Sequence, residues 1–148
     1  PFADIVMGLT NSIKYKSWDF SITARASIGN YAYNNLASNA VFNGAASINN
    51  ILNNIHSDYL STGFIDFTEN SLLSDHYIQE ASFVKIDNIS IGYNLSTKNG
   101  CKVRVFGSLQ NVATFTDYQG IDPEIYGGID NNFYPRPQTG VFGVTFEF

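Results

Sequence analysis

The 148-residue sequence is poor in charge, has a single cysteine and contains no long apolar run. Charged residues make up 14% of the chain, against roughly 25% in a typical soluble domain, which suggests that much of the surface does not face water. No segment approaches the roughly 18 apolar residues of a transmembrane helix, although alternating membrane strands escape that test. A formal net charge of −5 and the lack of a basic patch argue against nucleic-acid binding.

Further absences concern disulfides, catalysis and export. The lone Cys101 cannot form an internal disulfide. His56 and His76 lie in a predicted loop without a Ser or Cys partner, so we expect two surface histidines, no enzyme and no cofactor. The acids of the later loop match no EF-hand spacing, which weighs against a calcium site: Asp117, Asp122, Glu124 and Asp130. Without an initiator Met or a signal peptide, we expect a mature or C-terminal fragment of an exported protein.

The clearest positive signal is strict alternation in the last eleven residues, 138–148. One face carries Phe142, Val144, Phe146 and Phe148, and the other carries Val141, Gly143, Thr145 and Glu147. A transmembrane barrel strand has this pattern over roughly 10 residues, with its apolar face toward lipid. A terminal strand that ends in Phe is similar to the signal that bacterial outer-membrane proteins present to their insertion machinery.

Four earlier segments alternate in the same way, at about 4–15, 18–29, 82–96 and 101–111. Tyr15 and Trp18 flank a short turn, where an aromatic girdle would meet the membrane interface. The alternation changes parity near Asp87 and Asn88, which predicts a β-bulge. The dipeptide Asn99-Gly100 predicts a tight hairpin turn before the fourth strand.

Two long connections, about 30–81 and 112–137, lack strand alternation. Residues 45–56 have helical spacing and predict a short helix in the first. Antiparallel counting puts both short turns and the C-terminus on one side and both long connections on the other. Outer-membrane barrels have this asymmetry, with short periplasmic turns and long extracellular loops.

Three stretches resemble the C-terminal end of SusC/RagA-type TonB-dependent transporters of the Bacteroidetes outer membrane. They are YIQEASFVKIDNISIGY at 77–93, NVATFTDYQGIDPE at 111–124 and GIDNNFYPRPQTGVFGVTFEF at 128–148. Together they cover the second half of the chain almost continuously, whereas the first half is similar only in style.

The resemblance implies an all-β fold: the last five strands, about 18–22, of a 22-stranded antiparallel transmembrane β-barrel. It implies import of oligosaccharides or peptides, powered by the TonB complex acting on an N-terminus absent from this chain, as are the plug and the TonB box. The implied partners are the rest of the same transporter, a SusD-like surface lipoprotein that acts as a lid, the insertion machinery at Phe148 and outer-membrane lipid. The chain would be multi-pass, with a periplasmic C-terminus.

Candidate site residues fall into three groups. Loop residues that could contact substrate, or instead pack the loop, are Tyr118, Asp122, Tyr126, Asp130 and Tyr134. Charges expected to face the barrel lumen are Arg25, Lys102 and Arg104, of which the last two could guide an anionic substrate or pair with plug carboxylates. Residues expected to face lipid and to form the assembly signal are Phe142, Val144, Phe146 and Phe148.

Two alternatives remain open. A soluble, secreted β-sandwich that binds glycans would bury the Phe142–Phe148 face against a second sheet. A small autonomous barrel of adhesin type is disfavoured by the odd number of strands, because single-chain bacterial barrels have even numbers.

Overall fold

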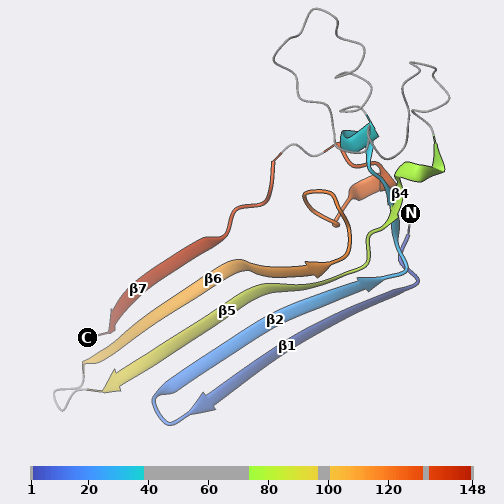
Figure 1. Cartoon of the computed structure of the whole chain (residues 1–148). Coiled ribbons are helices and arrows are strands. Elements are labelled where there is room, and N and C mark those ends of the chain that lie inside the picture. Colours follow the sequence, from blue (N-terminus) through green and yellow to red (C-terminus); the bar gives the residue numbers. More distant parts are fainter. Residues whose placement is uncertain (1, 39–73, 97–100, 132–133, 148) are drawn as a thin grey trace, which may run out of the picture. The chain divides into compact units, whose positions relative to one another are not determined.

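The computed structural model in Figure 1 describes residues 2–38, 74–96, 101–131 and 134–147. The predicted helix at 45–56, the Asn99-Gly100 turn and Phe148 lie outside these residues. The chain forms two compact units. The sheet unit comprises Asp4–Ile28, Phe83–Thr116 and Arg136–Phe148, and the loop unit comprises Pro1–Ala3, Gly29–Ser82 and Asp117–Pro135.

The sheet unit is one antiparallel sheet of five strands in the order β1-β2-β5-β6-β7 (Figure 1). Its strands are β1 (Ile5–Tyr15), β2 (Trp18–Ile28), β5 (Phe83–Ser96), β6 (Lys102–Thr116) and β7 (Thr139–Glu147). β6 runs five residues past the predicted end at 111, so the second long connection begins later than expected. Among the described residues, no helix is long and apolar enough to cross a membrane.

The register groups mostly apolar residues in some rows across the five strands and mostly polar residues in others. Directly opposed residues lie on the same face of a sheet, so each row of partners shares a face. One row is Tyr15, Trp18, Tyr93, Val105 and Val144. The row shifted by three residues along β1 is Ser12, Ser21, Ser90, Ser108 and Val141. We call the two sides the apolar face and the polar face, after these rows.

Neither face is sealed in this chain. Every residue of β1 is exposed, and on the apolar face the side chains of Leu9 and Phe142 are 61% and 76% exposed. A soluble sheet buries at least one face to offset the entropy of ordering its backbone. The apolar face therefore needs a covering that this chain does not supply from its described residues.

A stack of bulges keeps the two faces separate along the whole sheet. The row Thr23, Asn88 and Gln110 is followed by the row Ala24, Ile86 and Ala113. The two rows are one residue apart on β2, two residues apart on β5 and three residues apart on β6. β5 therefore has one extra residue relative to β2, and β6 has one extra residue relative to β5. The bulge predicted at Asp87 and Asn88 is confirmed, and it returns Ile86 to the apolar face.

Asn111 makes the bulge on β6 and ties it to the start of β7. Its φ is 53°, in the left-handed region that asparagine tolerates better than most residues. Its side-chain Nδ2 donates to the carbonyls of Arg136, at 2.7 Å, and Pro137, at 3.4 Å. In return, Nε2 of Gln138 donates to the Val112 carbonyl at 2.9 Å. These bonds hold the three residues before β7 beside the bulge.

The loop unit contains more regular structure than the sequence predicted. β3 (Tyr31–Tyr33) pairs antiparallel with β4 (Ile78–Glu80), where residues 30–81 were expected to lack strands. Short 3₁₀ turns lie at Asp75–Tyr77 and Tyr126–Gly128, and Ile129 bridges to Tyr33 in a parallel sense. Three-residue strands are too short for alternation to reveal them.

We predict that Asn111→Ala destabilises the protein more than Asn111→Gly. Glycine adopts the positive φ freely and loses only the amide hydrogen bonds, at about 1 kcal/mol. Alanine also carries the left-handed strain, for a total of about 2–3 kcal/mol. Urea unfolding of the purified protein measures both, and equal losses in the two variants would contradict the proposed role of φ.

Candidate functional site

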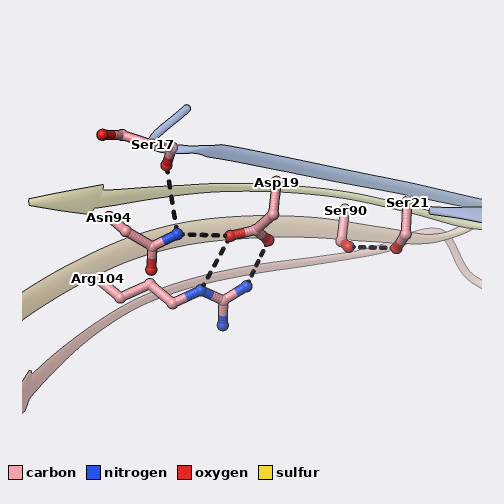
Figure 2. A network of polar contacts seen from close by, with 6 residues as sticks. All are labelled: Ser17, Asp19, Ser21, Ser90, Asn94 and Arg104. Carbon is pink, nitrogen blue, oxygen red and sulfur yellow. Dashed lines mark hydrogen bonds and ion pairs between the residues drawn. The ribbon is translucent and has the colours of Figure 1, made fainter. Parts of the chain in front are cut away.

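The polar face carries an ion pair that spans three strands. Asp19 on β2 accepts from Nη2 of Arg104 on β6 at 2.7 Å, and from its Nε at 3.4 Å (Figure 2). Asn94 of the intervening β5 donates to Asp19 at 3.0 Å, and also to the Ser17 carbonyl at 3.3 Å. The network joins the β1–β2 turn to β5 and β6 at one end of the sheet.

The ion pair depends on a glycine beneath it. Gly92 is the β5 partner of Asp19, so the carboxylate must pass over Gly92 to reach β6. A Cβ at position 92 would lie 2.6–2.8 Å from the three carboxyl atoms of Asp19. The absence of a side chain at this one position opens the path between β2 and Arg104.

The other two cations expected to face the lumen are also paired within the sheet. Nε of Arg25 donates to both carboxylate oxygens of Asp87, at 3.0 and 2.9 Å. Lys102 lies 3.4 Å from Glu147 on β7, with both side chains well exposed. The sequence left open whether Lys102 and Arg104 guide an anionic substrate or pair with plug carboxylates. In the structure, Lys102 has a carboxylate on the neighbouring strand β7, and Arg104 has one on β2, two strands away.

Between these charged groups the polar face is neutral and rich in hydroxyls. Ser21 and Ser90 are hydrogen-bonded at 2.7 Å, and Thr10 lies 3.5 Å from Thr23. Such a face suits water or a protein surface, because each hydroxyl both donates and accepts.

A buried Tyr–Asp pair organises the loop unit. The Tyr118 hydroxyl donates to Oδ2 of Asp130 at 2.8 Å, and Asp130 is fully buried. Burial is the main reason that the pKa of Tyr118 is raised well above its ordinary value, and the hydrogen bond to Asp130 adds to the shift. The Tyr118 ring packs with Ala32, Ala81 and Ile125, which form the core of this unit.

The structure divides the five loop residues that could contact substrate or instead pack the loop. Tyr118 and Asp130 are committed to each other, and Asp122 is 8% exposed and accepts from the Glu124 amide at 3.0 Å. These three side chains support the loop, which is the alternative that the sequence left open beside substrate contact. Tyr126 and Tyr134 are fully or almost fully exposed and stay candidates. Among the described residues, no group of His, Cys, Asp or Glu is arranged to hold a metal ion.

Sequence reasoning missed the partners of Arg104. Asp19 and Arg104 lie 85 positions apart, and only the register of the intervening strand brings them together. Strand alternation in the sequence already placed both residues on the polar face. The sequence did not show that Gly92, which has no side chain, lies between them and lets them meet.

An antiparallel sheet with one exposed apolar face and one polar face of paired charges has the architecture of a transmembrane barrel wall. Comparison with known proteins agrees. The chain is 35% identical over 156 residues to the TonB-dependent receptor SusC of Bacteroides thetaiotaomicron, covering all of this chain and 15% of that protein. It is 32% identical over 171 residues to TonB-dependent receptor P3 of Formosa agariphila, covering 17% of that protein. No protein-family model matches.

Solved structures share the fold. The RagAB peptide transporter superposes with a TM-score of 0.72 at 22% identity, over 97% of this chain and 17% of that one. The RagAB peptide importer in its open-open state gives 0.72 over 99% of this chain and 17% of the other. The chain belongs to the SusC/RagA family of TonB-dependent transporters, and spans 15–17% of the length of these relatives.

We predict that Gly92→Ala displaces the Asp19 carboxylate and breaks the bond to Arg104. Overpacking of this kind costs about 1–3 kcal/mol of unfolding free energy. Gly8→Ala is the matched control, because no atom lies within 4 Å of a Cβ built on this β1 glycine. Equal stability of the two variants in urea would show that Asp19 does not need the gap.

A second prediction concerns the buried pair. Tyr118→Phe leaves the Asp130 carboxylate without this donor and should cost about 1–3 kcal/mol. Tyr126→Phe should cost nothing measurable, because that side chain is fully exposed.

The same variants test the pH dependence. The folded state holds the Tyr118 proton more tightly than the unfolded chain, whose tyrosine pKa is about 10. The resulting stability is complete below that pH and is lost as pH rises toward the higher folded pKa. In urea unfolding, the free energy of unfolding should be lower at about pH 11 than at about pH 8, and Tyr118→Phe should make this difference smaller. If Tyr118→Phe leaves this difference unchanged, titrating groups other than Tyr118 cause the loss of stability.

Proposed function

We propose that this chain forms the C-terminal part of the barrel wall of an outer-membrane importer, as about strands 18–22 of a 22-stranded barrel. The observation that carries the proposal is the register, which places mostly apolar side chains on one side of five strands and mostly polar side chains on the other. β1 and β2 have 11 residues each, which suits a tilted membrane strand of roughly 9–11 residues.

In this proposal the apolar face contacts lipid and the polar face lines the interior. The apolar face includes Phe142, Val144 and Phe146 of β7, and the terminal Phe148 completes the signal to the insertion machinery. At the turn end, the rings of Trp18 and Tyr93 lie 4.6 Å apart beside Tyr15, as in an interfacial aromatic belt. Arg25, Lys102 and Arg104 then face the lumen, each neutralised by its carboxylate.

The proposed orientation follows from the ends of the strands. The β1–β2 turn, the start of β6 and the end of β7 share one end of the sheet. Short turns lie on the periplasmic side of such barrels, so the C-terminus is periplasmic in this proposal and the loop unit is extracellular.

We further infer that the whole transporter imports oligosaccharides or peptides, with a SusD-like lipoprotein as its extracellular lid and energy from TonB. Family membership supports the importer, and the RagAB peptide transporter supports a peptide as one ligand class. The loop unit contains no Lys or Arg, whereas nine of the thirteen acids belong to it. Its negative field disfavours anionic ligands, so neutral glycans or neutral and basic peptides suit it best.

The alternative of a soluble glycan-binding sandwich fits the structure less well. A sandwich needs a second sheet against the apolar face, and β3 and β4 of the loop unit are three residues long. The described residues contain no other sheet.

We predict that Ile91→Arg abolishes accumulation of the full-length transporter in the outer membrane, whereas Ser90→Arg is tolerated. The two residues are neighbours on β5 and point to opposite faces. Arginine on the lipid face near mid-depth costs about 2–4 kcal/mol, and an interior arginine meets water or polar groups. Quantitative immunoblotting of outer-membrane fractions measures the difference.

The reverse pattern would contradict the assignment of the faces. Equal loss in both variants would show that both faces of β5 are packed against protein, which would contradict a lipid-facing side.

We also predict that replacing Tyr126 and Tyr134 together by Ala weakens ligand binding by the transporter by roughly tenfold, as expected for lost aromatic contacts of about 1.4 kcal/mol. Calorimetry with the purified complex and a panel of neutral oligosaccharides and peptides provides the measurement. Gln119→Ala in the same loop unit is the control. Unchanged binding would exclude both tyrosines as ligand contacts.

A further inference from the structure

We propose that a hollow on the apolar face binds one acyl chain of a phospholipid, so that this part of the barrel wall holds a resident lipid. The proposal rests on the proposed function, in which the apolar face contacts the membrane. It goes further, because it assigns a ligand site to one place on that face and names the class of ligand.

The hollow has a volume of about 390 Å³ and lies over β5, β6 and β7, which are neighbours in the sheet (Figure 1). Two glycines form its floor, Gly107 on β6 and Gly140 on β7. Ser108 and Val141 also line it, but they belong to a row of the polar face. The walls come from the same two apolar rows as the glycines and are Ile89, Ile91, Leu109 and Phe142. The surface is therefore hollow because two consecutive apolar rows each have a position without a side chain.

The space over the glycines is open in the part of the chain that the structure describes. A Cβ built on Gly107 would lie 3.9 Å from the Val141 carbonyl oxygen, and one on Gly140 would lie 3.5 Å from the end of the Leu109 side chain. Neither distance is a clash. The side chains of Ile91 and Leu109 beside the floor are half-exposed, so a ligand can reach them from the membrane side.

The depth of the hollow corresponds to hydrocarbon. The aromatic row of Trp18 and Tyr93 includes Val105 and Val144, which precede Gly107 by two residues and follow Gly140 by four. At about 3.3 Å per residue and a strand tilt of about 45°, the two glycine rows lie roughly 5 and 9 Å inside the aromatic belt. Half of the hydrocarbon core is about 15 Å thick, so the hollow lies within one leaflet. The proposed orientation makes this the periplasmic leaflet, where the lipids are phospholipids.

An acyl chain matches the hollow in polarity and in shape. Water would find only apolar side chains on the walls, and apolar cavities stay dry. An empty hollow would deprive the lining atoms of dispersion contacts on one side. Inside a membrane no hydrophobic force favours burial, so van der Waals contact decides which neighbour stays. A chain in the hollow contacts the floor and the walls, whereas a chain on a level part of the sheet contacts protein on one side only.

The hollow is continuous with the interface at the turn end of the sheet. The row beneath it passes from Tyr93 on β5 to Val105 on β6 and Val144 on β7. The Tyr93 ring lies against Trp18, with ring centroids 4.6 Å apart, and forms one side of this path. The two valines are smaller than these rings, so a chain can run over them from a headgroup at the interface into the hollow.

Photolabelling of the full-length transporter tests the proposal. The protein is reconstituted in phosphatidylethanolamine vesicles in which a small fraction of the lipid carries a diazirine on one acyl chain. One sample is photolysed in the vesicles, and a second is photolysed after transfer to detergent and repeated washing. Mass spectrometry compares Ile91 and Phe142 beside the hollow with Ile13 and Phe20, which lie in the same row on β1 and β2.

We expect label at both pairs in the vesicles, because both lie on the lipid-facing side at one depth. After washing, the pair beside the hollow should carry roughly tenfold more label than the pair on β1 and β2, which corresponds to about 1.4 kcal/mol in binding free energy. Equal loss at both pairs would overturn this proposal and leave the barrel wall intact. Label on β1 and β2 alone in the vesicles would also overturn it, in favour of protein over the hollow. No label at either pair in the vesicles would overturn the proposed function itself.

Filling the hollow gives a matched pair of variants. Gly107→Val places a side chain on the floor and should lower the label retained after washing roughly tenfold, because the chain loses its contacts there. Ala24→Val enlarges a side chain on the same face of β2, outside the hollow, and should retain the label. Unchanged retention in Gly107→Val would overturn the site. If Gly107→Val does not fold, the comparison of positions in the unsubstituted protein still decides the proposal.

A native mass spectrum of the transporter purified from outer membranes identifies the lipid. We expect a bound phospholipid that Gly107→Val loses and Ala24→Val retains. Lipopolysaccharide in its place would overturn the assignment to the periplasmic leaflet.

Discussion

The register of the five long strands is the constraint on which the rest of the sheet unit depends. A slip of one residue between any two strands would move every side chain of one strand to the opposite face. Tyr15, Trp18, Tyr93, Val105 and Val144 would then no longer share a side. The stacked bulges at Asp87 and Asn111 change the register by whole steps without mixing the faces, so the sheet bends and stays two-sided.

The polar face carries charged side chains on the surface that would line the interior of the proposed barrel. Each of Arg25, Lys102 and Arg104 has a carboxylate within the sheet, so the charges of these three side chains are offset locally. Asp19 and Arg104 can pair only because β5, the strand between them, has no side chain in their path at Gly92. The lack of a side chain at Gly92 thereby allows Asp19 to fix the position of the Arg104 guanidinium, which lies two strands away.

Local patterns in the sequence were sufficient for the long strands. Alternation located the five segments to within a few residues, and the parity change at Asp87 correctly indicated a bulge. The extension of β6 was missed because Asn111 and Val112 interrupt the alternation at the bulge. β3 and β4 were missed because they are defined by pairing across 44 intervening residues rather than by a local period. The candidate site showed the same limit: composition pointed to Tyr118 and Asp130, but only the fold revealed that they satisfy each other.

The central claim is that the sheet is a membrane wall, with lipid on its apolar face and the barrel interior on its polar face. Spin labels placed singly at positions 105 to 109 of β6, in the full-length transporter in lipid, test it directly. The account predicts a period of two, with oxygen accessibility high at 105, 107 and 109 and low at 106 and 108. Accessibility with the opposite phase, or uniformly low accessibility on both faces, would contradict the account.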